Sequence, residues 1–184
     1  MQGSIDAVLA EIGQAVKGID EASVERLCAA LMGAGRIVVH GCGREKLQLQ
    51  GFAMRLFHLG LPVSVAGDVT APPVGQGDLL LACSGPGETS TVLALMDRAR
   101  EAGAGVFLLT AQEEGSAAAR ASDMLVIPAQ TMASDQGEAR SSVLPMGSLF
   151  EGALFVLFEL LVLRLAEKMG AGADAMRARH TNLE

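Results

Sequence analysis

Short apolar runs alternate along this chain with longer segments in which apolar residues recur at helical spacing. Two amphipathic segments come first, and Gly33 and Gly35 end the second of them. After these, apolar runs are mostly followed by a turn and a further helical segment. The pattern predicts helices at 5–16, 22–32, 45–59, 88–102 and 149–166, and strands at 36–40, 62–66, 78–83, 106–110 and 124–127.

The predicted strands indicate a sheet that is covered on both faces. They are uninterrupted runs of Val, Ile and Leu, without the alternation of a strand that has one face in water. Connections of this length favour right-handed parallel crossovers. The sequence therefore predicts a three-layer, doubly wound α/β domain with a five-stranded parallel sheet in the flavodoxin-like order 2-1-3-4-5. Ligands bind such sheets at the carboxyl ends of the strands, here after His40 and Cys83.

Composition is consistent with one domain and excludes some partners. The chain has 184 residues, of which 50% are hydrophobic, so it can bury one substantial core. We expect a single domain over 1–184, with N-terminal helices in 1–34, the sheet in 35–128, and a C-terminal helix and tail in 145–184. An aromatic content of 3% and a net charge of −7 argue against a nucleic-acid partner, because bases find few rings and phosphates are repelled.

Cysteine usage and charge bear on the compartment. The three cysteines are widely spaced without metal-binding spacing, and the first residues lack signal-peptide features, so we expect a cytoplasmic protein with no metal site. The apolar stretch 149–166 contains Glu151, Glu159 and Arg164, and each charge would cost roughly 2.5–3.5 kcal/mol near the centre of a membrane span. We therefore expect a buried or subunit-interface helix there and no membrane partner.

The turn after the first strand has the composition of an anion site. Gly41 and Gly43 allow the backbone to approach a ligand closely, Arg44 adds a positive charge, and the next helix begins here. A third glycine, as in dinucleotide-binding turns, is missing, since Lys46 stands in its place. A tight strand-to-helix turn explains the same glycines equally well, so both interpretations stay open.

The turn after the third strand is more informative. It is a run of small residues and hydroxyls between a buried strand and a helix. Backbone N–H groups and the hydroxyls of Ser84 and Thr89 would together form a concavity suited to phosphate. Helix capping by Thr89 or Ser90 is the alternative. A cap needs one hydroxyl and not this density of glycine, so the pattern favours ligand binding.

Several motifs carry a resemblance to a known family. Ser-Gly-x-Gly-Glu-Thr at 84–89 resembles the signature of sugar isomerase (SIS) domains. Three more motifs narrow the resemblance to one family among SIS domains: Phe-Ala-Met-Arg-Leu-x-His-Leu-Gly at 52–60, Leu-Pro-Met-Gly-Ser-Leu-Phe-Glu at 144–151 and Arg-His-x-Asn-Leu-Glu at 179–184. Together they resemble the 6-phospho-3-hexuloisomerase family, which interconverts 3-hexulose 6-phosphate and fructose 6-phosphate. The similarity spans nearly the whole chain.

The resemblance implies that a phosphorylated sugar binds between the two turns. The residues that match the family's binding pattern are Gly41, Gly43, Arg44, Ser84, Gly85, Gly87, Glu88 and Thr89. Two positions depart from it, because Glu45 and Pro86 stand where the family usually has serine. A carboxylate about 4 Å from a phosphate would be repelled by roughly 1–4 kcal/mol, unless Lys46 offsets it or Glu45 turns outward.

The resemblance also implies the chemistry, which is proton transfer through an enediolate without a cofactor. Glu151 matches the family's glutamate, and burial at the start of an apolar helix would raise its pKa toward neutrality. A first-turn acid that complements the helix dipole is the alternative. His180 is expected as an acid or oxygen-polarising partner, supplied by this chain or by a neighbour, because SIS domains generally form dimers or tetramers. A non-catalytic module that binds sugar phosphates, and an isomerase of a different phosphosugar, remain alternative functions.

Overall fold

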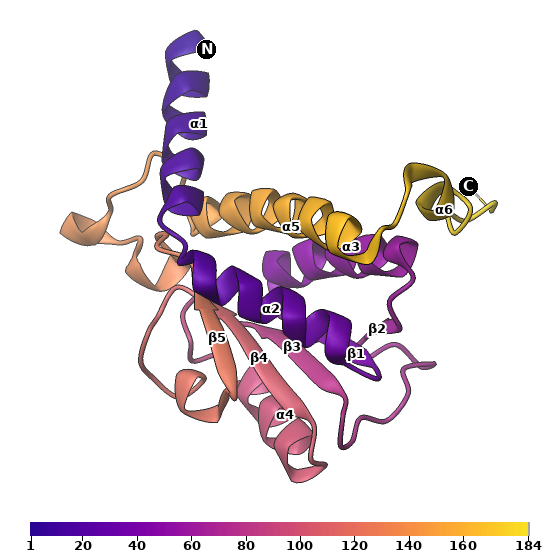
Figure 1. Ribbon diagram of the computed structural model, residues 1–184. Helices are drawn as coiled ribbons and strands as arrows, with labels where there is room; N and C mark the ends of the chain where they lie inside the picture. Colours follow the sequence, from indigo (N-terminus) through magenta and orange to yellow (C-terminus); the bar gives the residue numbers. More distant parts are fainter. Residues whose placement is uncertain (184) are drawn as a thin grey trace.

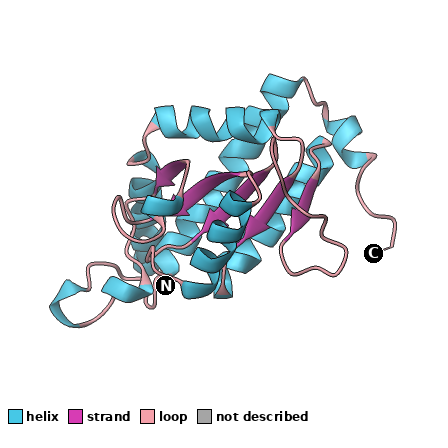
Figure 2. Cartoon of the chain, turned by 90° about the horizontal axis from the view of Figure 1, so that it is seen from below, coloured by secondary structure: helices cyan, strands magenta, loops and turns pink. Residues whose placement is uncertain are grey.

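Five parallel strands form the centre of the molecule, in the order β2-β1-β3-β4-β5 (Figure 1). The computed structural model describes residues 1–183. The strands are β1 (Ile37–His40), β2 (Val63–Val65), β3 (Leu79–Cys83), β4 (Gly105–Thr110) and β5 (Asp123–Val126). The predicted fold class and strand order are confirmed. Viewed from below, the strands lie between helices (Figure 2).

Alternate residues of the strands are buried against opposite helical layers, which explains the uninterrupted apolar runs. Ile37 and Val39 of β1 belong to a core shared with α2 (Glu21–Gly33), α3 (Gly43–Leu59) and α5 (Ser148–Met169). Val38, between them in sequence, belongs to a second core on the other face, where α4 (Ser90–Glu101) packs. A strand buried on both sides has no face left for water, so it shows no polar alternation.

The helical layers are unequal in size. Figure 1 shows α3 and α5 on one side of the sheet and α4 on the other. The connection from β4 to β5 contains only the short 3-10 helix η1 (Ala118–Arg120). The N-terminal helix α1 (Gln2–Lys17) packs against α5 and extends away from the sheet (Figure 1). The remaining elements are η2 (Met132–Ser134), η3 (Gly137–Ala139) and α6 (Ala173–Arg177).

The apolar helix α5 is a core helix whose charges have protein partners. Nine of its residues, from Leu149 to Leu165, are buried. The Arg164 guanidinium lies 2.9 Å from a carboxylate oxygen of Glu25, and Arg55 lies 3.3 Å from Glu159. Within residues 1–183, no helix combines the length and apolar character needed to cross a membrane.

The C-terminal tail is anchored rather than simply solvated, which the sequence pattern did not predict. The short helix α6 precedes Arg179, whose guanidinium donates a hydrogen bond to the backbone oxygen of His58 at 3.1 Å. The rings of His58 and His180 stack with centroids 5.2 Å apart. The tail therefore lies against the C-terminal end of α3.

Candidate active site

The carboxyl ends of the strands and the start of α5 enclose a cavity of about 560 Å³. We call it the strand-end cavity. It is lined by Cys42, Gly43, Arg44, Glu45, Pro86, Thr89, Thr131, Met132, Ala133, Gln136, Met146, Gly147, Phe150 and Glu151. Both turns singled out in the sequence thus contribute to one cavity, together with the expected base.

The 84–89 loop is folded by its own hydroxyls and glycines. The Ser84 and Thr89 hydroxyl oxygens lie 2.9 Å apart, and the Thr89 N–H donates to the Ser84 hydroxyl oxygen at 3.4 Å. Gly87 has a φ of +74°, a left-handed conformation that side chains disfavour. Thr89 occupies the N-cap position of α4, as the capping interpretation expected, but its hydroxyl makes no capping hydrogen bond. Because the loop turns this way, α4 starts at Ser90 and not at the predicted residue 88.

The predicted binding residues divide into two groups. Gly43, Arg44 and Thr89 line the strand-end cavity. Gly41, Ser84, Gly85 and Gly87 do not line it, although they shape the turns behind it. The carboxylate of Glu88 accepts a hydrogen bond from the Ser116 N–H at 2.7 Å and lies outside the cavity. Roles for these residues in binding stay predictions.

Glu45 turns inward, which answers a question that the sequence left open. Its carboxylate accepts a hydrogen bond from the Gly85 N–H at 3.0 Å. Burial raises the pKa of Glu45, while the Gly85 N–H and the Arg44 charge act in the opposite direction. The neighbouring Cys83 thiol is fully buried, and burial followed by the Glu45 charge raises its pKa well above the usual range.

Glu151 lies in the first turn of α5 and contacts Arg44 across the cavity. One Arg44 nitrogen is 3.0 Å from a Glu151 carboxylate oxygen, and another donates to the Ser148 hydroxyl at 2.7 Å. The Arg44 guanidinium also donates to the backbone oxygen of Met146. Burial raises the pKa of Glu151, the Arg44 charge lowers it, and the Glu45 charge raises it. The direction agrees with the effect of burial expected from the sequence, and the role of Glu151 as a base stays a prediction.

His180 does not line the strand-end cavity of its own chain. It lies on the far end of α3 with its ring against His58. The predicted catalytic contact therefore requires the His180 of a neighbouring copy, and it stays a prediction.

One side of the cavity was not predicted from the sequence. Thr131, Met132, Ala133, Gln136 and Met146, from the segment between β5 and α5, all line it. This segment has no helical or strand periodicity, so the hydrophobic pattern could not predict where it lies. Met146 and Gly147 have φ values of +57° and +76°, and only the Pro-Met-Gly sequence hints at this turn.

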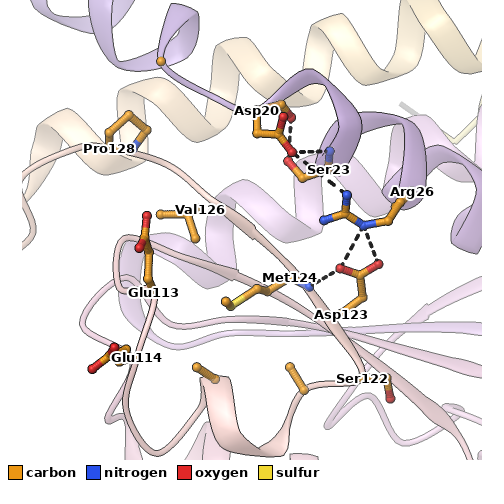
Figure 3. Close-up of a pocket in the computed structure, with 13 residues that line it drawn as sticks. Asp20, Ser23, Arg26, Glu113, Glu114, Ser122, Asp123, Met124, Val126 and Pro128 are labelled. Carbon is orange, nitrogen blue, oxygen red and sulfur yellow. Dashed lines mark hydrogen bonds and ion pairs between the residues drawn. The ribbon is translucent and has the colours of Figure 1, made fainter.

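A second hollow, of about 650 Å³, runs along the edge of the sheet between α2 and β5. We call it the β5 hollow (Figure 3). Several of its polar groups bond to one another: Asp20 accepts from the Ser23 N–H at 2.9 Å, and Arg26 donates to Asp123 at 2.8 Å. Across residues 1–183, no group of three or more His, Cys, Asp or Glu side chains is placed to hold a metal ion.

A parallel sheet in this order, with a hydroxyl- and glycine-rich loop after β3, is the arrangement of a sugar isomerase domain. The sequence model of the SIS domain matches residues 30–155, and the chain belongs to the SIS domain family. A Mycobacterium gastri protein named 3-hexulose-6-phosphate isomerase is 37% identical over 98% of this chain and 90% of its own. A Bacillus subtilis protein of the same name is 30% identical over 96% and 95% of the two chains.

A solved structure adds to this similarity. A Methanococcus jannaschii protein superimposes with a TM-score of 0.86 and 25% identity, covering 99% of both chains. It is described as a protein whose structure infers a molecular function of 3-hexulose-6-phosphate isomerase.

Proposed function

We propose that this chain is a phosphosugar isomerase that interconverts 3-hexulose 6-phosphate and fructose 6-phosphate. The observation that carries the proposal is that Glu151, a carboxylate with a pKa raised by burial, lines the same cavity as Thr89 of the 84–89 loop. The names of the M. gastri and B. subtilis relatives support the choice of substrate.

The proposed chemistry is a proton transfer between neighbouring carbons. Glu151 removes the proton from C2, the C3 carbonyl becomes part of an enediolate, and a proton is returned to C3. The proton of the C2 hydroxyl ends on the oxygen at C3, which completes the exchange of carbonyl and hydroxyl. A pKa raised by burial makes this carboxylate a stronger proton acceptor, as a general base requires. No electrons leave the sugar, so the reaction needs no cofactor.

The direct test is the substitution Glu151→Gln. We expect turnover of fructose 6-phosphate to fall by about 10²–10⁴-fold, the usual contribution of a general base. Binding of the sugar phosphate, measured by calorimetry, should survive, because the amide retains the size of the side chain. Glu113→Gln, which removes a carboxylate from the β5 hollow, serves as the control and should retain parental turnover. Parental turnover in Glu151→Gln would show that Glu151 is not the base.

We further propose that the site is completed by self-association, with His180 of a neighbouring copy as acid or oxygen-polarising group. An apolar groove bordered by Leu9, Leu47 and Phe155, all more than half exposed, shares Arg44 and Glu151 with the strand-end cavity. A second copy packed there would bury these side chains. Light scattering should give a dimer or tetramer mass that Phe155→Glu reduces. A monomeric parent protein would contradict self-association.

One observation favours a second candidate function, a module that binds sugar phosphates without turning them over. Glu45 carries negative charge into the cavity and Pro86 lacks an N–H, so the 84–89 loop is a weaker phosphate site than the family pattern implies. Binding of hexose phosphates without isomerisation would favour this module. We propose a cytoplasmic location for either function, consistent with three free cysteines.

A further inference from the structure

Four backbone N–H groups of the 84–89 loop, those of Ser84, Gly85, Gly87 and Thr89, already donate hydrogen bonds within the chain. The Gly87 N–H donates to the backbone oxygen of Ser84 at 3.0 Å, and Pro86 has no N–H. The Gly85 N–H, next to the end of β3, donates to the Glu45 carboxylate at 3.0 Å. A phosphate oxygen that approaches Gly85 therefore meets a donor that another anion already occupies.

The contact between Glu45 and Gly85 is close and enclosed. A Cβ atom added to Gly85 would lie 2.9 Å from the Glu45 carboxylate oxygen and 3.1 Å from both Phe150 and Thr131. Phe150 and Thr131 are 1% and 3% exposed, so the carboxylate is held between the loop, α5 and the segment after β5. Glu45 also lines the strand-end cavity, which makes it accessible to a ligand that enters there.

The charges of the cavity do not favour a phosphate while Glu45 is ionised. Arg44, Glu45 and Glu151 are its charged lining residues, and Arg44 already contacts Glu151 at 3.0 Å. When all three are ionised, the lining has a net charge of −1, and the phosphate group of the ligand carries up to two further negative charges. Removing the Glu45 charge, or moving it out of the cavity, would leave the lining neutral.

We propose that the Glu45 carboxylate occupies the place on the Gly85 N–H that the phosphate group of a sugar phosphate takes, so that the ligand must displace it. Glu45 is then a specificity-determining residue that weakens phosphate binding until the side chain leaves Gly85. The inference rests on the proposed binding of a phosphorylated sugar in this cavity, but not on its isomerisation.

The test measures binding without turnover, using inorganic phosphate and fructose 6-phosphate as calorimetric probes of the full chain. We expect Glu45→Ser to bind both probes at least about fivefold more tightly, the smallest effect of removing one charge about 4 Å away in water. Unchanged or weaker binding would overturn the proposal, and so would the absence of binding to both proteins. The test requires no turnover. If the parent chain has no isomerase activity but Glu45→Ser still binds phosphate more tightly, the proposed isomerase activity is refuted and the proposed role of Glu45 is supported.

Two further variants keep the test decisive. Glu45→Gln retains an oxygen acceptor for the Gly85 N–H and removes the charge, so it replaces the serine variant if that protein does not fold. Tighter phosphate binding by Glu45→Gln supports the proposal, and unchanged or weaker binding overturns it. Glu101→Gln, on the exposed end of α4, makes the same change in net charge and should leave the affinity unchanged. An equal gain in this control would overturn the proposal.

A ligand without phosphate provides the last comparison. Fructose has the same hydroxyl groups but no anion to compete with the Glu45 carboxylate. We expect the gain in Glu45→Ser to be restricted to the two phosphate-bearing probes. An equal gain with fructose would overturn the assignment of Glu45 as a competitor of phosphate.

Discussion

The strand-end cavity and the β5 hollow are similar in volume, about 560 and 650 Å³, and both are lined by acidic residues and one arginine. They differ in how these charges are solvated. In the β5 hollow, Arg26 and Asp123 form an exposed ion pair. In the strand-end cavity, burial raises the pKa of both Glu45 and Glu151.

The two hollows therefore differ in the desolvation of their carboxylates more than in their size. Burial disfavours the charged form of a carboxyl group and therefore raises its pKa. Two acidic groups of the β5 hollow also have structural roles, since Asp20 caps α2 and Asp123 pairs with Arg26. The carboxylates of Glu45 and Glu151 both line the strand-end cavity, where a ligand could reach them.

The largest difference between the two hollows is expected when Arg44 and Arg26 are each replaced and the change in kcat/KM is compared. Arg44→Met removes the cation next to Glu151, which should raise the pKa of Glu151 further and disturb the ligand site. We expect kcat/KM to fall by about 10²-fold, as when one charge-stabilising donor is lost. Arg26→Met, matched in residue type, should leave kcat/KM unchanged. Steady-state assays of both variants provide the measurement, and equal losses would show that the two hollows do not differ as described.

A smaller effect is expected on the free energy of unfolding, when a glycine of the 84–89 loop and a glycine of α3 are each replaced by alanine. Gly85→Ala would place its Cβ 2.9 Å from Glu45 and should lower the free energy of unfolding by about 1–3 kcal/mol. Gly51→Ala is the matched substitution on the exposed side of α3, where no atom lies within 4 Å, and it should raise stability by about 0.5–1 kcal/mol. Denaturant titrations would measure both, and a Gly85→Ala variant as stable as the parent would contradict the close contact.

The fold was predictable in detail from the chain. The buried strands could be predicted without knowing what packs against them, because an uninterrupted apolar run such as Leu79–Cys83 buries all its side chains only between two apolar layers. The predicted elements differ from the observed ones only at their ends, as at α4, where hydrogen bonds within the 84–89 loop delay the helix to Ser90, but the short helix α6 was not predicted. The anchored tail, with Arg179 on the backbone of His58, was not predicted, since it depends on a contact between residues far apart in the sequence.

The candidate site was predictable only in part. Local composition pointed to the turns that hold Arg44 and Thr89, and the resemblance pointed to Glu151. The side of the cavity lined by Met132 and Gln136 was not predicted, because an irregular segment has no hydrophobic periodicity from which its position could be inferred. Whether His180 reaches a site could not be predicted from the sequence, because within its own chain it does not line the strand-end cavity.

Periodicity and composition by themselves determined the layered α/β fold, the two turns at the carboxyl edge and the presence of a carboxylate at the start of an apolar helix. They did so because burial of apolar side chains and glycine's backbone freedom act locally along the chain. Only the tertiary structure decided that Glu45 turns inward onto Gly85 and that Arg44 contacts Glu151. Desolvation and ion pairing depend on neighbours brought together by folding, and no local pattern encodes those neighbours.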